Sequence, residues 1–266
     1  MSKAVSVPDL KRMKQRGELI VAVTAYDYST AVLLDQVNVD LILVGDSLAT
    51  VMLGHPNTLP VNMEEMLHHT RAVARGVQRA MVVADLPFMS YYTVEAALEN
   101  AGRFLKEARA AAVKLEGGKP PQLAAVTALV AQGIPVVAHL GFTPQSIHAL
   151  GGYYVQGKSL ESAKQLQAEA ELLAKAGACA LVLELVPPTL AAAISSDLEI
   201  PTIGIGAGPY CDGQIQVFHD LVGLGADYVP KHAARYAELR REICQAVERY
   251  AADVRARRFP EAEVMT

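Results

Sequence analysis

Short apolar runs, many of them rich in β-branched residues, alternate with longer helical stretches along the chain. Short uninterrupted apolar runs bounded by turn residues are typical of strands that are buried on both faces of a parallel sheet. The predicted strands cover residues 19–24, 41–44, 80–84, 111–115, 134–138, 178–183, 201–205 and 226–229.

Helices are predicted between these strands and at both ends of the chain. A charged helix over residues 8–16 comes first and is interpreted as a solvated surface helix. Residues 235–257 form one or two amphipathic helices. Two long irregular segments, 48–62 and 143–158, interrupt the pattern, and loops of this length inside a domain are usually functional or disordered. The remaining predicted helices cover residues 29–37, 63–78, 93–107, 122–132, 160–176 and 189–197.

Eight strands alternating with helices over 266 residues predict an α/β protein with a (β/α)8 TIM barrel, a fold of about 250 residues. A doubly wound open sheet is the alternative. The barrel is favoured because no strand is followed by a dinucleotide-binding fingerprint and because polar residues recur at strand ends. Without an internal repeat or linker, residues 1–266 are predicted to form a single domain with extra terminal helices.

Composition limits the possible partners and the compartment. The net charge is −4 and the Lys and Arg residues are spread along the chain, which argues against a nucleic-acid partner or a polybasic membrane anchor. No apolar run approaches the ~18 residues of a membrane helix, and residues 1–17 do not resemble a signal peptide. Three widely spaced cysteines suit a reducing compartment. We therefore expect a cytoplasmic protein.

Ionisable side chains follow five of the predicted strands. They are Asp46, which is followed by Ser47, and Asp85, Glu116, His139 and Glu184. Lys114 lies two residues before Glu116 and on the same face of its strand. In a barrel these strand ends meet at one rim, where active sites lie. Each residue alone has a simpler interpretation as a turn residue, a structural ion pair or a buried core histidine. Their recurrence at one level favours a shared site, because unpaired buried charges are costly.

This set of side chains suggests metal-assisted chemistry on a 2-oxo acid. Carboxylates without a histidine pair or a cysteine cluster are hard oxygen ligands that favour Mg²⁺ or Mn²⁺ over zinc. A 2-oxo acid bound through its carboxylate and keto oxygens would become acidic at the adjacent carbon. Glu184 is then the candidate base, and Lys114 the candidate donor to the resulting oxyanion.

Several long motifs resemble one family, that of ketopantoate hydroxymethyltransferase. They are VGDSLATVMLGHPNTLPV, HHTRAV, VVADLPFMSY, AVKLEGG, VVAHLGFTPQS, GGYYVQGK, LVLELVP and IPTIGIGAGPYCDGQIQVFHD, within residues 24–231. The resemblance implies transfer of a one-carbon unit from 5,10-methylenetetrahydrofolate to 3-methyl-2-oxobutanoate. The product would be 2-dehydropantoate, formed through a Mg²⁺-stabilised enolate. Members of this family form large homo-oligomers, typically decamers, and the resemblance implies the same here.

The family pattern also assigns roles to residues of this chain. The base that removes the C3 proton would be Glu184. The implied metal ligands are Asp46, Asp85 and, in a supporting role, Glu116. The implied substrate-binding residues are Asp46, Ser47, Asp85, Lys114 and His139. The 48–62 loop is our candidate for a flap that shields the enolate from water.

Other interpretations stay open. A Mg²⁺-dependent lyase or mutase acting on a 2-oxo acid or phosphonate would use a similar barrel rim, and a Schiff-base aldolase would use Lys114. A barrel that binds a metabolite without catalysis is a third possibility, although it would have no reason to keep buried charges. The segment Gly204-Ile205-Gly206-Ala207-Gly208 suits either a phosphate site or a tight turn. His68 and His69 lie in one helix and are expected to be structural. Tyr26, Tyr91 and Tyr92 are expected mainly to pack at the rim.

Overall fold

The structure is a computed structural model that describes residues 3–225, 230 and 233–260. Its residues group into two compact units, Met1–Val217 and Phe218–Thr266, which are described separately. That the whole chain forms a single domain stays a prediction.

The first unit contains a closed barrel of eight parallel strands, each hydrogen-bonded to the next along the chain, with β8 also paired to β1. The predicted (β/α)8 barrel is therefore confirmed. The strands are β1 (Ile20–Thr24), β2 (Leu41–Val44), β3 (Met81–Asp85), β4 (Ala112–Glu116), β5 (Val136–Gly141), β6 (Ala180–Glu184), β7 (Thr202–Ile205) and β8 (Gly213–Gln216).

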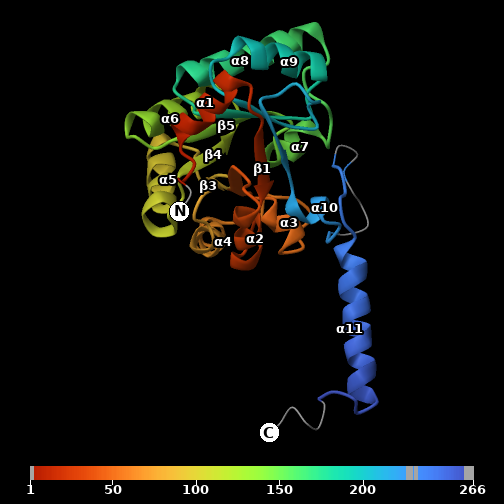
Figure 1. Ribbon diagram of the computed structural model, residues 1–266. Coiled ribbons are helices and arrows are strands. Elements are labelled where there is room, and N and C mark those ends of the chain that lie inside the picture. Colours follow the sequence, from red (N-terminus) through yellow and green to blue (C-terminus); the bar gives the residue numbers. More distant parts are fainter. Residues whose placement is uncertain (1–2, 226–229, 231–232, 261–266) are drawn as a thin grey trace. The chain divides into compact units, whose positions relative to one another are not determined.

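Helices surround these strands, as Figure 1 shows. Those that connect consecutive strands are α2 (Tyr28–Gln36), α4 (Met63–Gly76), α5 (Val94–Ala108), α6 (Pro120–Ala131), α8 (Leu160–Lys175) and α9 (Pro188–Asp197). The two predicted irregular segments hold short helices: α3 (Leu48–Val51) in the first, and the 3₁₀ helix η1 (Pro144–Ser146) with α7 (Ile147–Leu150) in the second. No described helix, in either unit, is long and apolar enough to cross a bilayer.

The prediction of the eighth strand was wrong. We expected it at residues 226–229, which lie outside the described residues, but the strand that closes the barrel is β8, between β7 and β1. The reason is its composition: in Gly213–Gln216 only Ile215 is a buried apolar residue, so the strand lacks the apolar run that marks the other seven. A strand with the sequence Gly-Gln-Ile-Gln is recognised only from its pairing with β1 and β7.

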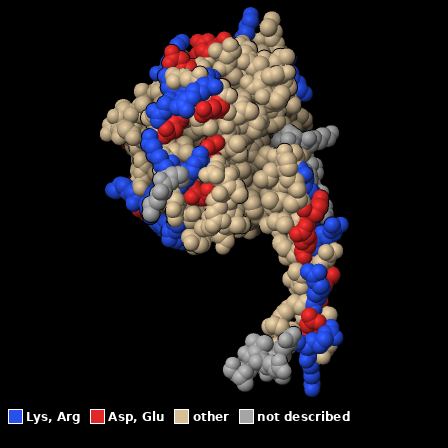
Figure 2. All heavy atoms as spheres, viewed as in Figure 1, with Lys and Arg blue, Asp and Glu red and all other residues tan. Residues whose placement is uncertain are grey.

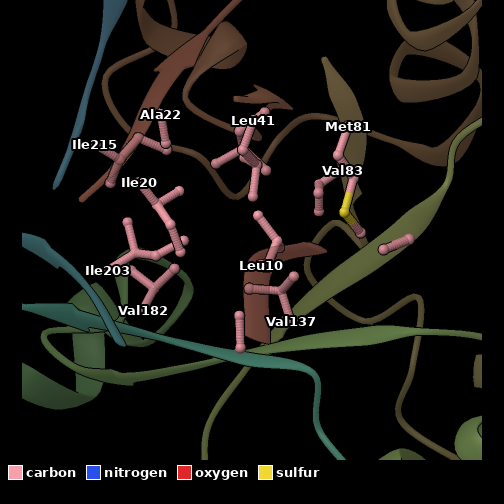
Figure 3. Close-up of a cluster of buried hydrophobic side chains, with 13 residues drawn as sticks. Leu10, Ile20, Ala22, Leu41, Met81, Val83, Val137, Val182, Ile203 and Ile215 are labelled. Atoms are coloured by element: carbon pink, nitrogen blue, oxygen red, sulfur yellow. The ribbon is translucent and has the colours of Figure 1, made fainter. Parts of the chain in front are cut away.

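The barrel interior is filled by every second residue of the strands. Figure 3 shows this cluster, to which β3 contributes Met81 and Val83 and to which β6 contributes Val182. The helix α1 (Val7–Arg16) adds Leu10, which is fully buried among these side chains. The interpretation of this helix as a solvated surface helix was therefore wrong, because one of its faces covers the barrel core.

Truncating Leu10 should test this role of α1. We expect Leu10→Ala to lower the free energy of unfolding by about 2–5 kcal/mol, since it removes a buried side chain and leaves a cavity. Chemical denaturation followed by circular dichroism measures the change. Leu33→Ala is the matched control, because Leu33 is 59% exposed on α2 and its truncation should cost less than about 0.5 kcal/mol. Equal losses in both variants would contradict a core role for α1.

The second unit contains α10 (Phe218–Leu221) and α11 (Leu239–Arg255). The helix α11 is amphipathic, as predicted, and exposes the apolar residues Ile243, Val247, Tyr250 and Val254. Acidic and basic side chains are interspersed along its length in Figure 2. After α11, the ring of Phe259 packs against Tyr250 at a centroid distance of 5.3 Å.

Candidate active site

The same alternation that builds the core places charged residues at the carboxyl ends of the strands. Side chains two residues apart in a strand point to the same face. In β3, Met81 and Val83 of the interior are followed by Asp85, and in β6 Val182 is followed by Glu184. The same spacing relates Ala112 of β4 to Lys114 and Glu116, and Val137 of β5 to His139. The interior therefore changes from an apolar layer to a layer of ionisable groups.

Strand register brings these groups beside one another. Asp85 of β3 is the register partner of Lys114 in β4, and Glu116 of β4 is the partner of His139 in β5. All four are at most 4% exposed. The sequence prediction that side chains from separate strands converge on one rim thus has a direct geometric basis.

Asp46 and Ser47 enter the site from the turn after β2. The backbone N–H of Asp46 donates to Asp85 Oδ2 at 3.0 Å, and the hydroxyls of Ser47 and Tyr26 lie 2.8 Å apart. Gly45 leaves room for the Ser47 hydroxyl, because a Cβ there would lie 2.8 Å from Ser47 Oγ and would force it to shift. Asp46 is 3% exposed.

Lys114 is the ammonium group of the cluster. Its Nζ lies 2.8 Å from Asp85 Oδ1 and 4.0 Å from Glu116 Oε1. Burial alone would lower the pKa of Lys114, but the charges of Asp85, Glu116 and Asp46 outweigh this and raise the pKa above its usual value. Lys114 is therefore held as a charged donor.

His139 lies between two carboxylates. Its Nδ1 is 3.5 Å from Glu116 Oε1, and its Nε2 is 3.4 Å from Glu184 Oε2. Burial and the nearby Lys114 charge lower the pKa of His139, but the contacts with Glu116 and Glu184 outweigh them and raise it to about 9. The imidazole thus links the interior carboxylate to Glu184.

The cluster carries an excess of negative charge. Burial, followed by the charges of Asp85 and Glu116, raises the pKa of Asp46 well above its usual value, and burial raises that of Asp85 despite Lys114. Buried acids with raised pKa values resist ionisation unless a cation compensates them. Apart from the ion pairs with Lys114 and His139, two buried oxygens, Asp85 Oδ1 and Glu116 Oε1, have no hydrogen-bond partner among the described residues.

This donor set fits a hard divalent cation. Among the described residues, no three Asp, Glu, His or Cys side chains converge closely enough to hold a metal alone. Mg²⁺ does not need such a cage, because it usually takes one or two carboxylates and completes its shell with water and substrate. Asp46 and Asp85, two adjacent buried carboxylates of raised pKa, are the residues that suit this arrangement.

One residue that contacts the cluster, Gln145, was missed from the sequence, and a second, Tyr91, was expected mainly to pack at the rim. Gln145 in η1 is 6% exposed, and its side-chain Nε2 donates to Asp46 Oδ2 at 2.8 Å. The hydroxyl of Tyr91 donates to Gln145 Oε1 at 2.6 Å, so Tyr91 does more than pack at the rim. A single glutamine in a long irregular segment gives no periodic signal. The run of aromatic residues at Tyr91 and Tyr92 was visible, but only the first of them reaches inward.

Some other expectations concern residues outside the cluster. His69 Nδ1 lies 2.6 Å from the backbone oxygen of Tyr26, a structural contact as expected. Gly204 and Ile205 are the end of β7, and the chain bends after them at residues 206 and 207. Gly208 has φ +77°, and a Cβ there would lie 2.6 Å from Pro188 Cβ. All three cysteines are free.

Comparison with known proteins decides the family. The profile of the family described as ketopantoate hydroxymethyltransferase matches residues 4–262. The chain belongs to this family. Two relatives named 3-methyl-2-oxobutanoate hydroxymethyltransferase illustrate the similarity. That of Cyanothece sp. is 54% identical, covering 96% of this chain and 98% of its own. That of Gloeobacter violaceus is 55% identical, covering 95% and 97%.

Solved structures at much lower identity share the fold with this member of the ketopantoate hydroxymethyltransferase family. Phosphonopyruvate hydrolase superimposes with a TM-score of 0.64 at 15% identity, covering 98% of this chain and 91% of its own. For 2,3-dimethylmalate lyase, a member of the PEP mutase/isocitrate lyase superfamily, the TM-score is 0.60 at 16% identity, covering 100% and 93%. At this identity the likeness concerns the barrel and not its chemistry.

Proposed function

We propose that this protein transfers a hydroxymethyl group to 3-methyl-2-oxobutanoate, with 5,10-methylenetetrahydrofolate as donor and Mg²⁺ or Mn²⁺ as the metal. A carbon–carbon bond forms between C3 and the methylene carbon, water supplies the hydroxyl oxygen, and tetrahydrofolate and 2-dehydropantoate leave. The observation that carries the proposal is the layer of buried carboxylates, Lys114 and His139 in a chain that is half identical to hydroxymethyltransferases. We also propose that it acts in the cytoplasm as a homo-oligomer.

The proposed metal ligands are Asp46 and Asp85, with Glu116 in support. When bound, the divalent ion acts as a Lewis acid that withdraws electron density from the keto group of the substrate. The paired carboxylates of raised pKa support this assignment, since they gain most from a compensating charge. Glu116 differs from them: although burial raises the pKa of Glu116, the contact with His139 outweighs it and lowers that pKa.

Glu184 is the proposed base that takes the C3 proton. Its side chain is 15% exposed, whereas those of Asp85 and Glu116 are 3% and 2% exposed, so Glu184 is the carboxylate most open to a substrate. Lys114, held as an ammonium, would donate to the developing oxyanion, and a charged amine is unsuited to forming a Schiff base. Ser47 would hold the substrate carboxylate, and His139 would line the pocket.

Proton exchange at C3 tests the proposal without folate. In deuterated buffer with Mg²⁺, we expect the protein to replace the C3 proton of 3-methyl-2-oxobutanoate, which collapses the methyl doublet in the proton NMR spectrum to a singlet. Chelation of the metal should stop exchange, and added Mg²⁺ should restore it. A protein that binds Mg²⁺ but catalyses no exchange would contradict the proposed chemistry. Turnover of a phosphonate in place of the folate reaction would favour a mutase or lyase.

A further inference from the structure

Gln145 is held in one orientation by three side-chain hydrogen bonds. Its Nε2 donates to Asp46 Oδ2 at 2.8 Å and to the backbone oxygen of Leu86 at 3.0 Å. Its Oε1 accepts from the Tyr91 hydroxyl at 2.6 Å. A reversed amide would place its oxygen against two acceptors, Asp46 Oδ2 and the Leu86 oxygen, so only one orientation satisfies all partners.

Gln145 also contacts Glu116 through its backbone. The backbone N–H of Gln145 donates to Glu116 Oε2 at 2.9 Å. Gln145, in the segment after β5, therefore holds one oxygen of each of two carboxylates. These are Asp46 in the turn after β2 and Glu116 at the end of β4. In both carboxylates the other oxygen, Asp46 Oδ1 or Glu116 Oε1, lies outside these hydrogen bonds. Glu116 Oε1 also faces His139 Nδ1 at 3.5 Å, so Asp46 Oδ1 is the oxygen that a cation would take first without displacing Gln145.

We propose that Gln145 is a positioning residue for the metal, and that Tyr91 acts through it by fixing the orientation of its amide. This inference rests on the metal site of the proposed function. Carboxylate ligands are fixed in orientation by hydrogen bonds from neighbouring residues, and loss of such a partner typically lowers metal affinity or activity about 10–100-fold. At this site, both the bond from Gln145 Nε2 and the bond from its backbone restrict how the carboxylates can rotate.

The test measures binding of Mn²⁺ alone, with neither substrate nor folate present. Free Mn²⁺ is followed by electron paramagnetic resonance during titration of the parent protein and of Gln145→Met, which keeps the side-chain length but removes its hydrogen bonds. We expect Gln145→Met to weaken binding about 10–100-fold. The matched control is Gln156→Met, since Gln156 lies in the same segment and, among the described residues, its side chain donates only to the backbone oxygen of Tyr154. It should bind Mn²⁺ as the parent does.

A double-mutant comparison tests the role of Tyr91. Tyr91→Phe should weaken Mn²⁺ binding less than Gln145→Met does, because the amide stays but loses one restraint. In the Gln145→Met background, Tyr91→Phe should have no further effect, since its target is gone. If the double variant loses Mn²⁺ affinity by the product of the two single-variant losses, Tyr91 acts independently of Gln145, and its proposed indirect role is overturned. If Gln145→Met fails to fold, weakened binding by Tyr91→Phe alone supports the inference, and unchanged binding overturns it.

The outcomes also separate this inference from the proposed function. If the parent binds Mn²⁺ and Gln145→Met binds it equally well, only the positioning role is overturned. The same holds if Gln145→Met merely lowers the unfolding temperature, as a purely structural residue would. A parent protein that does not bind Mn²⁺ would overturn the metal site and the inference together.

Discussion

Glu184→Gln is expected to lower the rate of C3 deuterium exchange about 100-fold to 10,000-fold, the usual contribution of a general base. The amide keeps the shape of the carboxylate but cannot accept the proton. Binding of 3-methyl-2-oxobutanoate to the Mg²⁺-loaded protein, measured by calorimetry, should change little, because the proposed metal and substrate contacts come from other residues. The loss should therefore appear in the exchange rate and not in affinity.

A second variant controls for the loss of one carboxylate charge. Glu199→Gln makes the same chemical change at a side chain that is 87% exposed and paired with Lys11 at 3.0 Å. It should exchange C3 deuterium at the parent rate. Exchange that persists in Glu184→Gln would place the base elsewhere. His139, 3.4 Å from Glu184, would be the next candidate, because this variant removes one of the two carboxylates that raise the pKa of His139.

Asp46→Asn is expected to stabilise the metal-free protein while it weakens metal binding. Because burial and the charges of Asp85 and Glu116 raise the pKa of Asp46, its ionised form opposes folding at neutral pH. The neutral amide removes this opposition, so the variant should be more stable than the parent at neutral pH. The asparagine oxygen can still accept from Gln145. The unfolding temperature in chelator should therefore lie above that of the parent.

Two measurements complete this test. Saturating Mg²⁺ should raise the unfolding temperature of the parent but have little effect on Asp46→Asn, since a ligand stabilises only the protein that binds it. Asp40→Asn is the contrasting control, because Asp40 is buried but paired with Arg79 at 2.7 Å and accepts from the Val21 N–H at 3.1 Å. It should be destabilised. If Asp46→Asn is destabilised as well, the neighbouring residues already compensate the negative charge of Asp46 without a metal.

The strands with uninterrupted apolar runs could be predicted from the sequence because burial on both faces leaves a clear signal. The same runs identified Asp85, Glu116, His139 and Glu184, since each follows its strand at a fixed spacing. β8 could not be found in this way, because Gln214 and Gln216 break its apolar character and pairing with β1 and β7 defines it. Leu10 was misjudged because charged neighbours conceal a single buried face.

Gln145 illustrates what sequence periodicity cannot reach. Its partners Asp46 and Glu116 are 99 and 29 residues away, and the segment that carries it has no repeating pattern. Only the closed barrel brings the three residues together. Residues that act through hydrogen bonds from irregular segments are therefore identified from coordinates, whereas residues on regular strands can be inferred from their position alone.

The core residues and the site residues lie on the same inward-facing positions of each strand. This arrangement also limits how the strands of such a barrel can change in length. Inserting one residue in β4 between Ala112 and Lys114 would turn Lys114 and Glu116 toward the helices and bring Leu115 inward. Inserting two residues would restore the facing of both but raise them along the barrel axis. Within these strands, only an insertion of an even number of residues keeps the site side chains facing inward. Insertions in the connecting segments are not restricted in this way. Variation in length among related barrels should accordingly be confined to the loops.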